Sequence, residues 1–311
     1  MCNITAAALL FLGSISDQRT SERNNDGIPA GSDLLVIPLK NTGRLFMIEA
    51  EIDNEKGNLI FDTGAGEIVL NTTYFRKYLS KNAPESRGIT GSVGKTASIR
   101  TENMNISGLR FSGVQAKLSD LSHIENRRGI KVLGLIGFGL LRNYEVVIDA
   151  VNNELLLYRI DSKGERASES NLFRSDHTQK FVEINNIVFV SGQVDGKVLR
   201  FCLDTGAETN VIDRYSPKTV LETFTIERST GLSGASSARA EVLVGTMNDF
   251  RLGNNQFRDM KTIITSLNTM SEAYGIETDG MLGYDFFISG TICINFIKRQ
   301  FDIQINRKEQ R

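Results

Sequence analysis

One segment of this chain occurs twice, and that repetition constrains the fold more than any other feature. The sequence IFDTGAGEIVLN at residues 60–71 matches CLDTGAETNVID at residues 202–213, so that Asp62 and Asp204 lie 142 residues apart. At average composition, a single Asp-Thr-Gly arises by chance in roughly one chain in fifteen of this length, so one copy carries little weight. Two copies within longer matching segments are much stronger evidence for a shared role than one copy.

Further matches follow the first in the same order. The four-residue segments GITG and GLSG are 143 residues apart, and the octapeptides GLIGFGLL and GMLGYDFF are 146 apart. Because the separation drifts by only a few residues, we expect an internal duplication of a unit of about 130 residues, far longer than a solenoid repeat. The matched segments are residues 88–91 with 231–234, and 134–141 with 280–287.

Both halves show the pattern of β-structure. Short runs of branched and aliphatic residues, such as LFMIEAEI and ARAEVLVGTM, are separated by Gly, Asn and Asp. Residues 54–57 and 194–197 have the composition of hairpin turns at the same place in each half. Helical periodicity is weak, and short helices are expected only near Thr73–Leu79 and Tyr215–Thr223. The sequence therefore predicts an all-β chain of two lobes related by a pseudo-two-fold axis.

Polar segments divide the chain between these lobes. Residues 17–32 are rich in Ser, Asn, Asp and Gly and are expected to form a flexible leader. A second polar stretch at residues 161–179 is expected to link the lobes. The predicted N-terminal lobe spans residues 33–160, the C-terminal lobe spans residues 180–306, and residues 307–311 form a tail.

The first residues resemble an export signal. ITAAALLFLG at residues 4–13 is apolar, and small residues at Ser14 and Ser16 fit a signal-peptidase site after residue 16. Ten apolar residues are too few to span a bilayer, which needs about 20. We expect residues 1–16 to be a signal peptide and the protein to be exported to a periplasmic, cell-surface or secreted location. A buried N-terminal element is the alternative.

Charge and composition exclude several classes of function. The 311 residues carry a net charge of -1, which offers no electrostatic basis for binding nucleic acid or an anionic membrane. Of three cysteines, Cys202 and Cys293 lie in apolar runs and are expected to be buried. The two histidines, His123 and His177, are expected in surface loops, and no Cys/His cluster exists. Neither a metal site nor a cofactor is predicted.

Alone, an Asp at the end of a strand is a turn residue that bonds its own backbone. Paired lobes change this interpretation, since a two-fold axis brings equivalent loops together. Two carboxylates within about 3 Å cannot both ionise and would share a proton. One member could then take a proton from water while the other donates to a carbonyl oxygen. We therefore expect Asp62 and Asp204 to form a catalytic pair.

The residues after each Asp suit such a pair. Gly64 and Gly206 have no Cβ, which allows two loops to approach closely, and their amides can bond the carboxylates. Thr63 and Thr205 can bridge the loops through their hydroxyl groups and hold the pair rigid.

In these motifs the chain resembles the aspartic proteases of the pepsin and retropepsin superfamily. The resemblance covers residues 33–306 and rests on two Asp-Thr-Gly-Ala loops and on the later elements at residues 135–137 and 281–283. It implies the bilobal aspartic-protease fold with few short helices. It also implies that Asp62 and Asp204 are the catalytic dyad.

The glycine-rich segments at residues 88–94 and 231–237 fall where this superfamily has its flaps. A hairpin tip rich in glycine can move and can approach a bound backbone closely. Ordinary hairpin loops are the alternative interpretation. Neither segment contains the tyrosine of a pepsin flap, and the sixteen residues between Ser16 and Asp33 are too few and too poor in lysine to resemble a pepsin-type propeptide. The candidate flap residues are Gly88, Gly91, Gly94, Gly231 and Gly234.

Other motifs are assigned structural roles. The glycines of residues 137–142 lack the third glycine of a dinucleotide loop, because Arg142 stands in its place. Asp279 is expected in a turn. Asp149 and Asp285, each in or beside a strand of one half only, are expected to have local structural roles.

Two functions remain open from the sequence. The first is an aspartic endopeptidase that acts on peptides or proteins, as a monomer because the second lobe replaces a dimer partner. The second is a catalytically inactive or regulatory relative that holds an extended peptide between its lobes. The mature chain is expected to make no stable insertion into a membrane.

Overall fold

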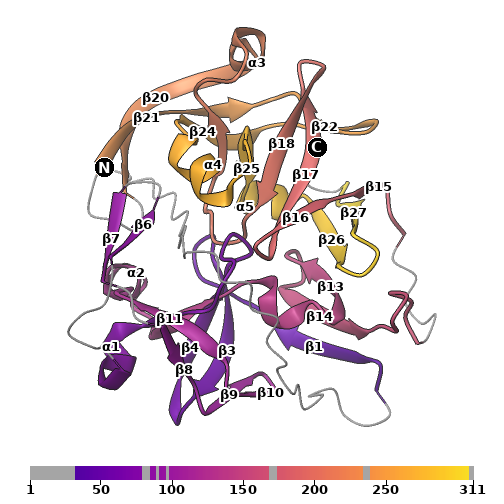
Figure 1. The fold of residues 1–311 in the computed structure, drawn as a ribbon. Coiled ribbons are helices and arrows are strands. Elements are labelled where there is room, and N and C mark those ends of the chain that lie inside the picture. Colours follow the sequence, from indigo (N-terminus) through magenta and orange to yellow (C-terminus); the bar gives the residue numbers. More distant parts are fainter. Residues whose placement is uncertain are drawn as a thin grey trace.

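The computed structural model describes residues 32–78, 85–88, 91–95, 98–167, 174–233 and 239–307. Within these residues the protein is mainly β, and two curled sheets form two lobes, one above the other in Figure 1. The all-β, bilobal fold class predicted from the sequence is confirmed. The expected signal peptide and nearly all of the expected leader lie outside the described residues.

The N-terminal lobe contains a nine-stranded sheet. Its strands are β2 (Lys40–Asn41), β3 (Phe46–Ile52), β4 (Glu55–Phe61), β5 (Val69–Asn71), β8 (Ser98–Arg100), β9 (Asn103–Ile106), β10 (Leu109–Ser112), β11 (Gln115–Ser119) and β12 (Val132–Ile136). Strand β12 runs parallel to β4 and antiparallel to β5, and so inserts between them. All five residues of β12 are buried, as expected for the continuous apolar run VLGLI.

The C-terminal lobe contains a ten-stranded sheet. Its strands are β16 (Val182–Ile184), β17 (Ile187–Val194), β18 (Lys197–Leu203), β19 (Asn210–Asp213), β20 (Phe224–Ser233), β21 (Arg239–Met247), β22 (Phe250–Leu252), β23 (Asn255–Phe257), β24 (Met260–Thr265) and β25 (Gly280–Leu282). Here β25 runs parallel to β18 and antiparallel to β19, in the same way that β12 lies between β4 and β5.

The two sheets share one strand order. The N-terminal order is β10-β9-β3-β4-β12-β5-β11-β8, and the C-terminal order, taken from its other end, is β23-β22-β17-β18-β25-β19-β24-β21-β20. Eight positions correspond, and the C-terminal sheet adds β20 at its edge. Each Asp-Thr-Gly segment therefore follows the equivalent strand of its lobe, β4 or β18.

A six-stranded sheet joins the lobes, on the right of Figure 1. Its centre is the antiparallel pair β13–β26, in which Val147 lies opposite Cys293, the residue 146 positions later. Equivalent residues thus face each other across the junction, as a two-fold axis demands. In order, the strands are β1 (Leu34–Pro38), β14 (Glu154–Arg159), β13 (Tyr144–Asp149), β26 (Gly290–Asn295), β27 (Gln300–Ile305) and β15 (His177–Lys180).

Aromatic side chains connect this joining sheet to the base of the first Asp-Thr-Gly loop. The ring of Phe61 packs against Phe138 with centroids 6.0 Å apart, and Phe138 packs against Phe296 at 5.2 Å. Phe181 meets the other side of Phe296 at 5.6 Å. Because Phe61 directly precedes Asp62, the carboxylate follows a side chain that is buried and fixed on several sides.

The helices of the described chain are short. The two that were predicted near residues 73–79 and 215–223 are present as α1 (Thr72–Phe75), continued by the 3₁₀ turn η1 (Arg76–Tyr78), and as α3 (Lys218–Glu222). The others were not predicted, because four to seven residues are too few to show a helical period. They are α2 (Ser122–Arg128), η2 (Phe138–Leu141), α4 (Asn268–Tyr274) and α5 (Tyr284–Phe287).

Three local predictions were wrong. His123 lies in α2 and His177 in β15, both half-buried, whereas both were expected in surface loops. Asp285 lies in α5, not beside a strand. In addition, β15 begins at His177, inside the segment expected to be a linker, because it pairs with β27. The domain boundaries themselves stay a prediction.

No helix among the described residues is long and apolar enough to cross a membrane.

Candidate active site

The two Asp-Thr-Gly loops meet between the lobes. Each is hydrogen-bonded to the end of the inserted strand of its own lobe, β12 or β25. The amide of Asp62 donates to the carbonyl of Ile136 at 2.9 Å, and that of Asp204 donates to Leu282 at 3.0 Å. Within each loop a tight turn follows, in which Ala65 and Ala207 donate to the carbonyls of Asp62 and Asp204. The equivalent strands thus give both carboxyl groups the same setting.

Each carboxyl group is buried and held by its own loop. Asp62 is 0% exposed and Asp204 is 1% exposed. The amide of Gly64 donates to Asp62 Oδ1 at 3.0 Å, and that of Gly206 donates to Asp204 Oδ1 at 2.8 Å. In the described part of the chain, no donor bonds the other oxygen, Oδ2, of either group. Each carboxyl group therefore keeps one buried oxygen that no donor of the described chain satisfies.

The glycines allow the two carboxyl groups to approach. A Cβ atom on Gly64 would lie 2.6 Å from Cγ of Asp204, and one on Gly206 would lie 2.5 Å from Cγ of Asp62. Real Cβ atoms do not come this close to other heavy atoms. Each carboxyl group consequently packs against the glycine of the other lobe, and any larger residue would push it away.

Burial and proximity alter the acidity of both groups. Burial raises the pKa of Asp62 well above its ordinary value, and the charge of Asp204 together with a hydrogen bond between the carboxyls raises it further. Burial also raises the pKa of Asp204, to about 6, although bonds from Asp62 and the loop amides oppose this shift. The two carboxyl groups therefore retain a proton to higher pH than an ordinary aspartate, and the pair titrates as one unit.

A reciprocal network of hydroxyl groups supports the pair. The hydroxyl of Thr63 donates to the carbonyl of Leu203 at 2.8 Å and accepts from the amide of Thr205 at 3.0 Å. In the same way the hydroxyl of Thr205 donates to Phe61 at 2.6 Å and accepts from the amide of Thr63 at 3.0 Å. The structure brings together all six residues that sequence analysis placed at this site: Asp62, Thr63, Gly64, Asp204, Thr205 and Gly206.

The structure adds four residues that sequence analysis missed. Arg44 and Arg128 of the N-terminal lobe contact Glu208, four residues after Asp204. Asn186 and Tyr274 of the C-terminal lobe bond the carbonyls of Gly66 and Gly64. The residue types differ between the lobes, so the repeat gives no signal for these four residues, and their partners lie 80 to 210 positions away.

The candidate flap residues lie in two hairpins. Strand β6 (Glu85–Gly88) pairs with β7 (Gly91–Lys95), which places Gly88 opposite Gly91 and Gly94 opposite Ser86. Gly231 lies in β20 opposite Glu241 of β21, and Gly234 lies outside the described residues. Both hairpins are on the left side of Figure 1. Their role as flaps stays a prediction.

The acids given structural roles bond to other partners. Asp279 Oδ2 accepts from the amide of Arg200 in β18 at 2.7 Å, so Asp279 holds a strand and not the turn that was expected, and Asp149 bonds Asn152 at the end of β13. Asp285 pairs with Arg44.

Cys202 and Cys293 are buried, as predicted. Among the described residues, no group of three or more His, Cys, Asp or Glu side chains could hold a metal ion.

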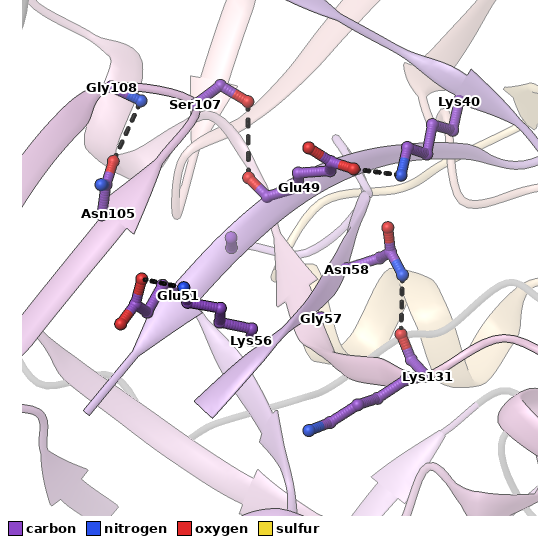
Figure 2. Close-up of a pocket in the computed structure, with 11 residues that line it drawn as sticks. Lys40, Glu49, Glu51, Lys56, Gly57, Asn58, Asn105, Ser107, Gly108 and Lys131 are labelled. Carbon is purple, nitrogen blue, oxygen red and sulfur yellow. Dashed lines mark hydrogen bonds and ion pairs between the residues drawn. The ribbon is translucent and has the colours of Figure 1, made fainter. Parts of the chain in front are cut away.

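An open depression of about 480 Å³ lies on the N-terminal lobe, remote from these loops. Figure 2 shows Lys40 of β2 paired with Glu49 of β3, and Lys56 of β4 paired with Glu51 of β3. Its charged side chains neutralise one another in pairs at the surface and converge on no common point. It contains none of the residues predicted for the site, so the dyad is the better candidate.

Comparisons with known proteins agree with this geometry. An aspartyl protease family model matches residues 190–286, which include the second Asp-Thr-Gly loop and most of α5. No curated protein matches the chain. Among solved structures, an aspartic proteinase from Irpex lacteus is similar with a TM-score of 0.53 and 10% identity, over 88% of this chain and 98% of that chain.

A retropepsin-like aspartic protease from Rickettsia conorii is similar over 40% of this chain and 90% of that chain, with 23% identity and a TM-score of 0.31. The match to the Irpex lacteus proteinase extends over both lobes and shows the fold, while the family model matches part of the C-terminal lobe. Residues 190–286 thus match the aspartyl protease family, and the chain as a whole has the fold of an aspartic proteinase.

Proposed function

We propose that this protein is an aspartic endopeptidase that hydrolyses peptide bonds with Asp62 and Asp204 as its catalytic dyad. One observation carries the proposal. Two buried carboxyl groups from equivalent loops face each other, each with one oxygen bonded to a loop amide and one oxygen left without a donor. Burial and mutual charge raise the pKa of both, so that one proton is retained between them.

In the proposed first step, Asp204 acts as a general base and Asp62 as a general acid. The carboxylate of Asp204 takes a proton from a bound water, and the water oxygen forms a bond to the carbonyl carbon of the peptide. Asp62 donates its proton to the carbonyl oxygen, which becomes a hydroxyl group. The product is a neutral tetrahedral diol, and the pair again holds one proton, now on Asp204.

In the second step the carbon–nitrogen bond breaks. The proton on Asp204 goes to the leaving nitrogen, and one diol hydroxyl returns its proton to Asp62 as the new carboxylic acid forms. Protons balance over the cycle, and no covalent bond to the protein is needed. The supporting threonine network would keep the two groups fixed during these transfers, which need no reorganisation of the loops.

The proposed substrate is an extended peptide. The β6–β7 and β20–β21 hairpins, one from each lobe, offer strand edges to which an extended backbone can bond. A non-catalytic protein that holds a peptide in the same place is the second candidate. The raised pKa of both carboxyls favours the enzyme, because a peptide-binding protein has no need for two buried acids that share a proton.

Cleavage of unfolded peptides by the purified chain tests the proposal. We expect cleavage at acid to neutral pH, inhibition by a statine-containing inhibitor, and loss of cleavage in both Asp62→Asn and Asp204→Asn with the fold retained. Asn at either site keeps the shape but cannot transfer the proton. Residual cleavage by the double variant would rule out this dyad. Peptide binding without cleavage by the native chain would favour the second candidate.

We also propose that the protein is exported and acts as a monomer. Export rests on the apolar run at residues 4–13, and the monomer on the presence of both Asp-Thr-Gly loops in one chain. Mass spectrometry of the protein expressed in its natural host would detect cleavage after Ser16. Light scattering at concentrations used for activity would detect a dimer.

A further inference from the structure

Each Asp-Thr-Gly loop is held by two side chains from the opposite lobe, and the two sets differ in charge. The loop of Asp62 is held by neutral groups. Asn186 Nδ2 donates to the carbonyl of Gly66 at 2.8 Å, and the hydroxyl of Tyr274 donates to the carbonyl of Gly64 at 3.3 Å.

The loop of Asp204 is held by two arginines instead. Arg44 Nε donates to the carbonyl of Glu208 at 2.5 Å, and Arg128 forms an ion pair with the carboxylate of Glu208. Arg44 also pairs with Asp285 in α5, and its guanidinium lies 4.7 Å from the ring centroid of Tyr284. Two cations of the N-terminal lobe therefore face two acids of the C-terminal lobe.

These residues occupy equivalent places in the repeat. Arg44 and Asn186 are 142 positions apart, as are Asp62 and Asp204, and both have a left-handed backbone, with φ of 80° and 65°. Arg128 and Tyr274 are 146 apart, and each is the last residue of a seven-residue helix capped by glycine. Asp285 corresponds to Gly139. The same scaffold thus carries an ionic set of contacts at one loop and a neutral set at the other.

Most of the ionic set is withdrawn from solvent, although the Arg44 side chain is 31% exposed. The side chains of Arg128 and Glu208 are 12% and 13% exposed, and Arg128 Nη1 also donates to the carbonyls of Thr42 and Gly43 at 2.9 and 2.7 Å. One guanidinium therefore links the turn that carries Arg44 to the loop that carries Asp204. Loss of one partner leaves a buried charge without compensation, so that the loop must move to solvate it.

We propose that Arg44 and Arg128 are positioning residues that set the place of Asp204 relative to Asp62. This inference rests on the proposed function. Neither guanidinium is assigned a contact with the reacting atoms, and both act through Glu208. Since a displacement of about 1 Å costs on the order of 100-fold in rate, loss of these contacts is expected to lower kcat and to leave KM nearly unchanged.

The experiment compares four proteins: the full chain, Arg44→Ala, Arg128→Ala and, as a matched control, Arg166→Ala. Arg166 pairs with Glu145 beside the joining sheet, with 17% and 12% exposure, so the control removes an equally buried ion pair away from the dyad. We expect kcat to fall ~100-fold in Arg44→Ala and Arg128→Ala but less than about threefold in Arg166→Ala. If an alanine variant fails to fold, Glu208→Gln is measured in its place, because it keeps the side-chain shape and removes the charge that pairs with Arg128.

Two kinetic outcomes overturn the proposal. The first is an unchanged kcat in folded Arg44→Ala and Arg128→Ala. The second is a rise in KM alone, which would make these arginines substrate contacts.

A measurement without turnover separates this inference from the proposed function. The shared titration of the dyad is followed by ¹³C NMR of the aspartate side-chain carbons in the same proteins. We expect a shifted titration in Arg128→Ala and none in Arg166→Ala. Identical curves in the native chain and Arg128→Ala contradict the positioning role, even where cleavage is observed. A shifted titration in a chain that cleaves no peptide supports positioning and refutes only the peptidase activity.

Discussion

Thr63 and Thr205 bond each other reciprocally across the two lobes, with each amide nitrogen 3.0 Å from the hydroxyl oxygen of the other residue. Each hydroxyl also donates to a carbonyl of the opposite loop. Four hydrogen bonds therefore cross between the lobes in a region fully withdrawn from water. A loop that shifted alone would lose bonds on both sides, so this network favours movement of the two loops together or not at all.

Thr63→Val should destabilise the protein strongly. Valine keeps the shape of threonine but leaves one buried amide and one buried carbonyl without partners, which we expect to cost ~3 kcal/mol. Thr63→Ser should cost much less because the hydroxyl remains. Urea unfolding of both variants measures this difference.

Thr101→Val is the matched control. Thr101 is 1% exposed, and its hydroxyl makes a single bond of 3.3 Å to the carbonyl of Val114, within one lobe. A loss of ~1 kcal/mol is expected there. Equal losses at Thr63 and Thr101 would show that the inter-lobe network adds nothing beyond one buried hydroxyl.

Gly206→Ala should abolish catalysis with a smaller effect on stability. The new methyl group would lie 2.5 Å from Cγ of Asp62, so that this carboxyl must move away from Asp204. We expect a decrease in kcat of at least ~100-fold, measured with a peptide substrate, because the two groups would no longer face one water.

Gly139→Ala provides the comparison for this substitution. Its nearest neighbour would be Asn186 Nδ2 at 3.6 Å, an ordinary contact. The variant should retain kcat within about threefold, since no catalytic group need move. A similar loss at Gly139 and Gly206 would mean that any added methyl group in this region blocks activity, and the crowding argument would fail.

Repetition explains which features could be predicted from the sequence. Asp62 and Asp204 were identified because the same residues recur at a fixed separation within strands of the same pattern. The strand-rich lobes followed from the alternation of aliphatic runs and turn residues. The recurring motif and the strand pattern are local or periodic signals, and both can be recognised in a single sequence.

Contacts between unlike residues could not be predicted in this way. Arg44 and Asn186 occupy equivalent places but share no chemistry, and their partners become visible only when the lobes are packed together. His123 was misplaced for a related reason: α2 spans seven residues, too few for a helical period. His177 was expected in a linker, but the pairing of β15 with β27 depends on residues more than 120 positions away.

Asn186 should tolerate glycine better than alanine. Its φ of 65° is unfavourable for alanine, and its side chain donates to the carbonyl of Gly66 at 2.8 Å. Asn186→Gly loses this partly buried bond and an exposed bond that Oδ1 accepts from Arg142, together ~1 kcal/mol, whereas Asn186→Ala adds backbone strain and should cost ~2 kcal/mol. Urea unfolding distinguishes the two variants.

Asn153→Gly is the control for the hydrogen bond. Asn153 also has a left-handed backbone, with φ of 56°, and in the described residues its buried side-chain oxygen accepts no hydrogen bond. Glycine there should change stability by less than ~0.5 kcal/mol. If Asn153→Gly and Asn186→Gly are equally harmful, the loss reflects the flexibility of glycine and the bond to Gly66 has no measurable value.

The dyad should make the native protein less stable as pH rises from about 4 to about 7. Asp204 has a pKa of about 6 when folded, against an ordinary value of 3.8, and the pKa of Asp62 is raised as well. Between these values the folded state binds more protons than the unfolded state, so the free energy of unfolding falls with pH. For Asp204 alone, this change corresponds to roughly 3 kcal/mol.

Thermal unfolding of the native chain and of Asp204→Asn across this pH range tests the sign. Asparagine does not titrate, and it removes the charge that raises the pKa of Asp62, so the variant should lose less stability and should exceed the native chain near pH 7. Asp149→Asn, at the end of β13 and away from the dyad, should follow the native pH dependence. A stability difference between the native chain and Asp204→Asn that stays constant with pH would mean that the carboxyl groups do not share a proton in the folded protein.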